Sequence, residues 1–187
     1  MRRADIDTVK NGNTPWDLGP GTTLIRILAR NAELLGQRVA MREKHLGIWQ
    51  ETSWSQLLDD TLACAAGMEH LGFDREDALL VLGDNRPRLY MGMLAAGMLG
   101  GYAMPVYPDA THDEIRHFMH EAHVRFVLAE DQEQVDKVLD LGDQDKPIDH
   151  IIYDEPRGLA SYPNPGLVSW DKLLAIGADR LRAEPKL

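Results

Sequence analysis

Apolar and polar positions form blocks along the chain, and the block over residues 78–109 organises the others. The uninterrupted apolar run from Ala78 to Leu82 predicts a buried strand. Pro87 stands where a first helical residue is expected, and residues 89–99 are apolar nearly all round, which predicts a buried helix. A second short strand is expected over residues 102–107. Strand, helix and strand within about 30 residues form a βαβ unit, which favours a parallel sheet.

The segments before this unit also show regular spacing of apolar residues. Gly36 and Gly72 are typical helix stops, and Leu46-Gly47 predicts a hairpin turn between two short strands. The expected elements are a helix over 24–35, strands over 39–45 and 48–52, and a helix from Ser53 or Ser55 to about Leu71.

After the unit, strands and helices continue to alternate. Thr111 with Glu114 three residues later is the capping-box pattern of a helix start. This alternation predicts an α/β fold, with an open, largely parallel sheet and helices on both faces. We expect a polar lead-in over 1–20 and one domain over 21–187. The expected elements are a helix from Thr111 to about His123, a strand over 124–129, a helix from Asp131 to near Gly142, a strand over 148–153, a loop over 156–166 and a helix from Ser169 to about Leu181.

Charge and cysteine content narrow the function classes. The chain has 20 Lys and Arg against 30 Asp and Glu, a net charge of −10, which argues against nucleic-acid binding and against an anionic membrane surface. No run approaches the ~20 apolar residues of a membrane span, and no apolar segment follows Met1-Arg2-Arg3 as in a secretory signal. Cys64 is the single cysteine, so no internal disulfide is possible, and its apolar neighbours predict a buried side chain rather than a nucleophile.

The most conspicuous polar cluster is a set of four histidines: His112, His117, His120 and His123. On a helix, positions 117, 120 and 123 drift by about 60° per step, so the three rings do not converge on one ion. We therefore interpret them as part of an exposed polar helix.

The carboxylate pairs Asp59-Asp60 and Glu130-Asp131 fit a helix surface and a helix start, where negative charge is favourable, better than acid–base catalysis. Gly21-Thr22-Thr23 resembles a phosphate loop only faintly and is better explained as the start of a helix. Tyr107-Pro108-Asp109 closes a strand at the end where α/β sheets bind ligands, although we favour a packing role. Sequence patterns of serine hydrolases, dinucleotide-binding folds and P-loop enzymes do not occur in the 187 residues.

Several motifs together resemble those of a known enzyme superfamily. Residues 95–109, AAGMLGGYAMPVYPD, and residues 52–57, TSWSQL, resemble the second and first core motifs of the adenylate-forming synthetases. With residues 130–137 and 154–159, the resemblance is to the bacterial long-chain fatty-acyl-CoA synthetases, over about residues 14–180. The third core motif of that superfamily, a Ser/Thr/Gly-rich loop ending in Pro-Lys-Gly, does not occur in this sequence.

The resemblance implies an incomplete N-terminal part of the large domain of an ATP-dependent long-chain fatty-acid–CoA ligase. Such an enzyme uses a fatty acid, ATP, Mg²⁺ and coenzyme A, and the resemblance implies a cytoplasmic location, with peripheral membrane contact of the full-length enzyme left open. Because the phosphate loop and the catalytic lysine segment are missing, we expect this chain to be inactive alone. We assign it no catalytic, cofactor-binding or metal-binding residue.

Two other functions stay open at this point. One is a non-catalytic interaction or dimerisation module derived from such an enzyme, which forms a homodimer or pairs with a full-length copy. The other is a flavodoxin-like nucleotide-binding protein, which needs a phosphate loop at the carboxyl end of a strand. The candidate turns for that loop, Gly83-Asp84-Asn85 and Pro108-Asp109-Ala110, contain too little Gly, Ser and Thr to favour it.

Overall fold

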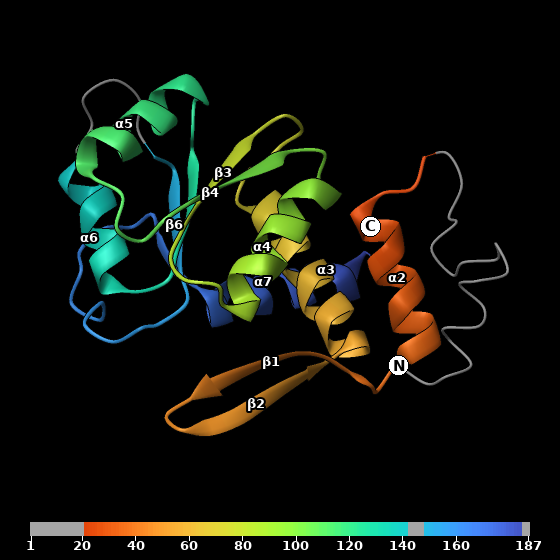
Figure 1. The fold of residues 1–187 in the computed structure, drawn as a ribbon. Coiled ribbons are helices and arrows are strands. Elements are labelled where there is room, and N and C mark those ends of the chain that lie inside the picture. Colours follow the sequence, from red (N-terminus) through yellow and green to blue (C-terminus); the bar gives the residue numbers. More distant parts are fainter. Residues whose placement is uncertain (1–20, 142–147, 185–187) are drawn as a thin grey trace, which may run out of the picture.

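The computed structural model describes residues 21–141 and 148–184, and shows helices packed around a central sheet (Figure 1). The predicted lead-in over 1–20 and the predicted helix stop at Gly142 lie outside the described residues. In chain order the elements are α2 (Leu24–Leu35), β1 (Val39–His45), β2 (Ile48–Ser53), α3 (Trp54–His70), β3 (Ala78–Leu82), α4 (Pro87–Met98), β4 (Tyr102–Val106), α5 (His112–Glu121), β5 (Phe126–Ala129), α6 (Gln132–Asp140), β6 (His150–Tyr153), β7 (Leu167–Ser169) and α7 (Trp170–Ala183).

Five strands form the main sheet in the order β4-β3-β5-β6-β7, and every neighbouring pair is parallel. The predicted α/β class and parallel sheet are therefore confirmed. Strand β7 was not predicted, because its three residues are too few to show a periodic pattern and they follow a loop rich in Pro and Gly.

Helices cover both faces of this sheet, which explains the continuous apolar runs of β3 and β5. Helices α3, α4 and α7 pack on one face, and α5 and α6 on the other (Figure 1). Successive residues of a strand point to opposite faces. The first face therefore buries Leu79, Val81, Phe126, Leu128 and Ile152, and the second buries Leu80, Leu82, Val127, Ala129 and Ile151.

The predicted helix starts are confirmed where capping side chains were recognised. Thr111 and Glu114 form a complete capping box, in which Glu114 N–H donates to Thr111 Oγ1 at 3.3 Å and Thr111 N–H donates to Glu114 Oε2 at 2.8 Å. Ser53, and not Ser55, caps α3, and its capping box is completed by Gln56.

Some predicted boundaries and burials were wrong. The helix expected to reach His123 ends at Glu121, and the strands expected from 124 and 148 begin at Phe126 and His150. Helix α4 was expected to be buried, and Leu89, Met91, Ala95 and Ala96 are, but Tyr90 is 40% exposed.

Strands β1 and β2 form a separate antiparallel hairpin outside the main sheet. Leu46 and Gly47 connect the two strands with positive φ angles of 47° and 83°. In Figure 1 the hairpin runs below the helices of this face, and Ala40 and Met41 of β1 pack against the core between those helices and the sheet.

Candidate functional site

The loops that follow β3, β5 and β6 meet at one edge of the sheet, where the parallel strands end. Glu130, directly after β5, lies between the other two loops. Its N–H donates to Leu82 O at 2.8 Å, and its own carbonyl accepts from Glu155 N–H at 2.8 Å. This is the edge at which open α/β sheets generally bind ligands, so it is the candidate site of the chain.

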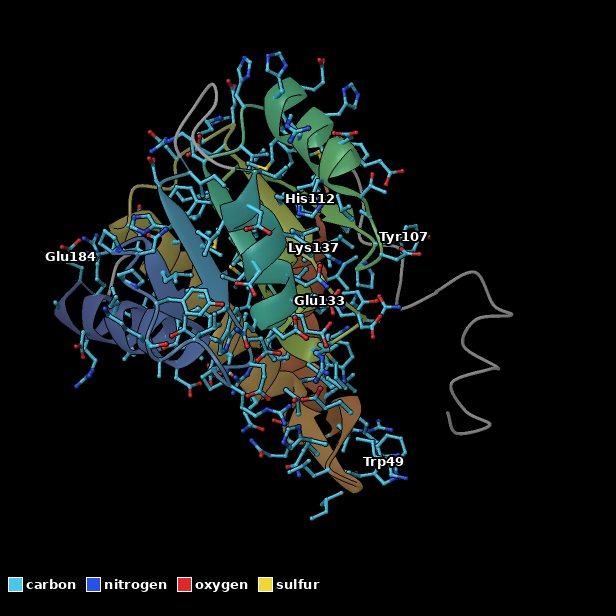
Figure 2. All side chains as sticks on the ribbon, turned by 90° about the vertical axis from the view of Figure 1, so that its left-hand side faces the viewer. Trp49, Tyr107, His112, Glu133, Lys137 and Glu184 are labelled. Carbon is cyan, nitrogen blue, oxygen red and sulfur yellow. The ribbon has the colours of Figure 1, made fainter. Side chains whose placement is uncertain are left out.

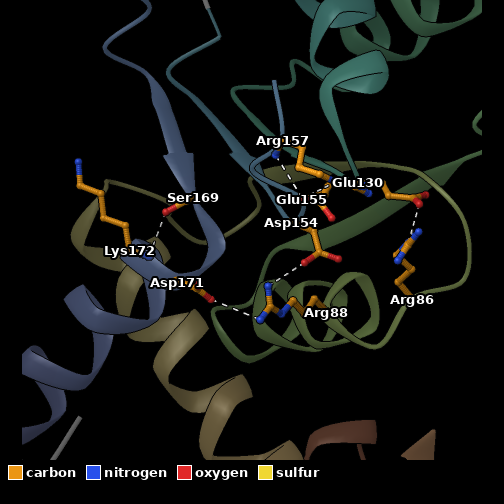
Figure 3. Close-up of polar contacts among 9 residues, drawn as sticks. All are labelled: Arg86, Arg88, Glu130, Asp154, Glu155, Arg157, Ser169, Asp171 and Lys172. Carbon is orange, nitrogen blue, oxygen red and sulfur yellow. Dashed lines mark hydrogen bonds and ion pairs between the residues drawn. The ribbon is translucent and has the colours of Figure 1, made fainter. Parts of the chain in front are cut away.

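Glu130 is the central charged group of this edge (Figure 3). Its carboxylate is almost completely buried and accepts from Arg86 Nε at 2.5 Å and from Asp84 N–H at 2.6 Å. Gly83 permits this approach, since its φ is +146° and an added Cβ would lie 2.8 Å from Glu130 Oε2. Partial burial opposes the charge of Arg86, but the hydrogen bond and negative charge of Glu130 outweigh it and raise the guanidinium pKa.

Arg88, in the first turn of α4, joins three elements (Figure 3). One of its terminal nitrogens lies 2.9 Å from Asp154 Oδ1, at the end of β6, and the other lies 3.3 Å from Asp171 Oδ1, in the first turn of α7. Burial raises the pKa of Asp154, and the nearby Arg88 opposes that rise. Arg88 therefore links the end of β6 to the first turns of α4 and α7, although its own side chain is 40% exposed and that of Asp171 is 82% exposed.

Beside these contacts lies an open cleft of about 270 Å³. Its charged lining comprises two arginines and four carboxylates, so the acidic groups outnumber the basic ones. Arg157 is 78% exposed at the side chain, and its Nε lies 3.1 Å from Glu155 Oε1. Burial opposes the charge of Glu155, but the hydrogen bonds and charge of Arg157 outweigh it and lower the pKa of this carboxyl. The cleft is lined by Arg86, Glu130, Asp131, Gln132, Glu133, Glu155 and Arg157.

This arrangement is unsuited to binding a phosphate group. An anion would meet the acidic majority, and both arginines already contact carboxylates of the same chain. The geometry supports a structural role for the strand-end charges.

The structure places the predicted polar residues as follows. Asp131 caps α6, with its carboxylate accepting from Gln134 N–H at 3.2 Å. In Tyr107-Pro108-Asp109 the carbonyl of Pro108 accepts from Lys137 Nζ at 2.5 Å, which ties this loop to α6, while Tyr107 is 80% exposed. Asp60 lies on α3, where burial, and then the charge of Asp59, raise its pKa.

Arg86 and Arg88 were missed by sequence reasoning. A signal was available, because two arginines follow a buried strand within six residues, on the turn and helix start at its carboxyl end.

The four histidines do not meet. His112 Nε2 lies 3.9 Å from Asp140 Oδ2, and His123 Nδ1 lies 2.9 Å from the backbone oxygen of His120. Within residues 21–141 and 148–184, no three His, Cys, Asp or Glu side chains are placed to hold a metal ion. Cys64 is buried, and burial raises the pKa of its thiol, which disfavours the reactive thiolate. None of the described helices is long and apolar enough to cross a membrane.

Comparison with known protein families identifies the class of protein to which this chain belongs. The family model of the AMP-binding enzymes matches residues 28–178. The chain therefore belongs to the AMP-binding enzyme family, whose members are adenylate-forming enzymes.

Similar proteins include ligases for long-chain fatty acids. The chain is 23% identical over 160 residues to the long-chain-fatty-acid–CoA ligase ACSBG2 of Xenopus laevis. The aligned residues cover 86% of this chain and 21% of that protein. It is also 23% identical over 164 residues to the human ACSBG2, covering 85% of this chain and 24% of that protein. The chain thus spans about a fifth to a quarter of the length of these relatives.

Solved structures with the same fold include a CoA synthetase and a CoA ligase. The acetoacetyl-CoA synthetase from Streptomyces lividans superposes with a TM-score of 0.71 at 18% identity, over 81% of this chain and 24% of that one. The anthranilate CoA ligase AuaEII superposes with a TM-score of 0.72 at 15% identity, over 85% of this chain and 29% of that one. At these identities the likeness establishes the fold.

Proposed function

We propose that this chain is the N-terminal portion of an ATP-dependent ligase that joins long-chain fatty acids to coenzyme A. The match of the AMP-binding family model over residues 28–178 carries this proposal. The relatives named as long-chain-fatty-acid–CoA ligases support the choice of substrate. In the complete reaction a fatty-acid carboxylate attacks the α-phosphate of ATP and releases pyrophosphate, and the coenzyme A thiol then displaces AMP.

In this proposal the described residues supply scaffold rather than catalysis. Adenylation needs Mg²⁺, amides that cradle phosphates, and cations that stabilise developing charge. The charges at the strand ends contact one another instead, and the 187 residues contain no Ser/Thr/Gly-rich loop ending in Pro-Lys-Gly. We therefore expect ATP, Mg²⁺ and coenzyme A to bind residues of a longer polypeptide. We place that enzyme in the cytoplasm, since the single cysteine fits a reducing compartment.

Sequencing the source DNA beyond the Leu187 codon, followed by an activity assay, tests the proposal. The frame should continue into a Ser/Thr/Gly-rich loop ending in Pro-Lys-Gly. The extended polypeptide should release pyrophosphate from ATP only when a long-chain fatty acid is present. Its variant with Ala in place of the lysine of that loop is the matched control and should lose this release.

The 187-residue chain, assayed in parallel, should release no pyrophosphate above a blank without fatty acid. Release by this chain would disprove its expected inactivity. An extended polypeptide that responds to acetate or an aromatic acid, and not to a long-chain fatty acid, would disprove the substrate assignment while leaving the family assignment intact.

A non-catalytic interaction module is the second candidate. It is favoured by the aromatic side chains beside the β4 edge, where Tyr102 is 48% and Tyr107 80% exposed. A stop codon close after Leu187, together with a monodisperse dimer in sedimentation velocity, would support this function. A purely monomeric chain that does not bind a full-length copy would contradict it.

A further inference from the structure

Glu130 links the three loops that follow β3, β5 and β6. Its backbone N–H donates to Leu82 O and its carbonyl oxygen accepts from Glu155 N–H, both at 2.8 Å. The two oxygens of its carboxylate accept separately, one from Asp84 N–H at 2.6 Å and the other from Arg86 Nε at 2.5 Å. One residue therefore fixes the end of β3, the loop that follows it and the loop after β6.

The stability of the fold does not explain a carboxylate at this position. Only 9% of the Glu130 side chain is exposed, against 39% of its partner Arg86. Removing a carboxylate from water costs free energy, and a buried ion pair generally stabilises a protein no more than apolar residues of the same volume. The pair is better explained by the specific arrangement that it imposes on the groups it joins.

Gly83 shows that the loop after β3 is shaped around this carboxylate. Its φ of +146° is one that residues with side chains rarely adopt. An added Cβ would collide with the Cβ of Glu130, and would lie 2.8 Å from Glu130 Oε2 and 3.0 Å from Leu89 Cδ2. Glycine loses more conformational freedom on folding than any other residue, so this close approach has a second cost in free energy.

Every residue of the loop between β3 and α4 is held as a result. Asp84 donates its N–H to Glu130, and its carbonyl oxygen accepts from Arg86 N–H at 2.8 Å. Asn85 Oδ1 accepts from the hydroxyl of Tyr90 at 3.0 Å. Arg86 is the N-cap residue of α4, but its side chain contacts Glu130 instead of capping the helix. The loop thus has one defined conformation at the edge where open α/β sheets bind ligands.

We propose, on the basis of the ligase assignment above, that Glu130 is a positioning residue for an adenine nucleotide, the part that ATP and coenzyme A share. It acts through the loop between β3 and α4, which it holds as a fixed wall beside the open cleft, and not by contact with the nucleotide. A wall that is ordered before binding lowers the entropy lost on binding and keeps the ligand in a productive geometry. The acidic lining of the cleft agrees with this indirect role, because a carboxylate in contact with phosphates would repel them.

The first measurement is amide hydrogen exchange in the 187-residue chain and in its Glu130→Gln variant. Glutamine has nearly the same shape but one oxygen acceptor, so its side chain cannot give a separate oxygen to Asp84 N–H and to Arg86 Nε. Exchange at Asp84 should become about tenfold faster or more, while exchange in the centre of β5 should stay unchanged. Unchanged exchange at Asp84 would show that the carboxylate does not order the loop, and would overturn the proposal.

The second measurement is the steady-state kinetics of the extended polypeptide, with pyrophosphate release and thioester formation assayed separately. Glu130→Gln should raise the KM for ATP or for coenzyme A by about tenfold or more, with the KM for the fatty acid unchanged. The pyrophosphate assay contains no coenzyme A, so it shows which of the two nucleotides is affected. If Glu130 served stability alone, glutamine would lower the fraction of folded enzyme, and kcat would fall with every KM unchanged. That result would overturn the proposal.

Glu51→Gln is the matched control. Glu51 also pairs with an arginine, Arg42, at 2.8 Å, but this pair is exposed on the β1–β2 hairpin. Figure 2 shows Trp49 at the far end of the hairpin, apart from Glu133 of α6. The control should leave all three KM values and the exchange at Asp84 as in the wild type. An equal effect of both substitutions would assign the change to net charge and overturn the role of Glu130.

Failure of the ligase assignment can be distinguished from failure of this role. An extended wild type that releases no pyrophosphate with a long-chain fatty acid would contradict the assignment. Calorimetric binding of ATP and of coenzyme A to the same two proteins would then test Glu130. Wild-type affinity of the Glu130→Gln variant for both nucleotides would overturn the positioning role, and so would a wild type that binds neither.

Discussion

Gly177 fixes how closely helices α3 and α7 approach. An added Cβ at this position would collide with the carbonyl oxygen of Ala63 and lie 2.9 Å from the backbone nitrogen of Gly67. Gly67 in turn faces the backbone oxygen of Leu173, 2.5 Å from where its own Cβ would lie. Small residues on both helices therefore allow a backbone-to-backbone contact, which in turn lets Leu173 and Trp170 reach the core.

Replacing Gly177 by Ala should destabilise the chain by about 1–3 kcal/mol, since the helices must separate to make room. The measurement is the free energy of unfolding in urea. Gly97→Ala is the matched control, because Gly97 is also helical, in α4, but an added Cβ there would meet no atom within 4 Å.

The control should be stabilised by about 0.5–1 kcal/mol, as alanine restricts the unfolded chain and favours the helix. Equal effects of the two substitutions would show that helix propensity, and not the contact with α3, governs position 177.

Helices α3 and α4 are linked by charges as well as by apolar contacts. Asp60 on α3 has a pKa raised above its ordinary value of 3.8, first by burial and then by the charge of Asp59, and Arg88 on α4 opposes these effects. Because the folded state binds this proton more tightly than the unfolded chain, the ionised Asp60 lowers stability at neutral pH. That penalty is relieved as pH falls through the raised pKa towards 3.8.

Asp60→Asn should therefore stabilise the chain at pH 7, by less than about 1 kcal/mol because the group is partly solvated. The gain should shrink as pH falls and vanish below the ordinary pKa. Urea unfolding at several pH values measures it. Asp171→Asn removes an exposed partner of the same Arg88 and should give no such gain. If both variants lose stability at pH 7, attraction to Arg88 outweighs the burial of Asp60.

At the scale of single helices and strands, much of the fold could be predicted from the sequence. Strands β3 and β5 are buried on both faces and so appear as continuous apolar runs, and Thr111 with Glu114 marks a helix start by a local contact. The pairing of Arg86 with Glu130 could not be predicted, because 44 residues separate them and only the strand order β4-β3-β5 brings them together.

At the scale of the whole molecule, the two edge strands of the parallel sheet have unpaired backbone groups that could pair with strands of other molecules. At one edge β7 has only three residues. At the other edge, Tyr102 N–H donates to Asp77 O, so Tyr102, Met104 and Val106 face β3, and Ala103 and Pro105 face outward. Proline has no N–H, so this edge offers a single outward donor, at Ala103.

Pro105 therefore protects the β4 edge against pairing with strands of other molecules. Pro105→Val should restore the missing donor and add a residue that favours strands, so it should raise association at a given concentration, measured by sedimentation velocity. Ala103→Val is the matched control, because it enlarges a side chain on the same strand and keeps the proline.

The two variants separate backbone pairing from apolar contact. If Pro105→Val associates and Ala103→Val behaves like the wild type, the missing N–H is what limits the edge. If both associate equally, exposed apolar surface governs association, and the proline has no protective role. If neither associates, the twist of β4 or its exposed neighbours Tyr102 and Tyr107 already block an approaching strand, and the role assigned to Pro105 is wrong.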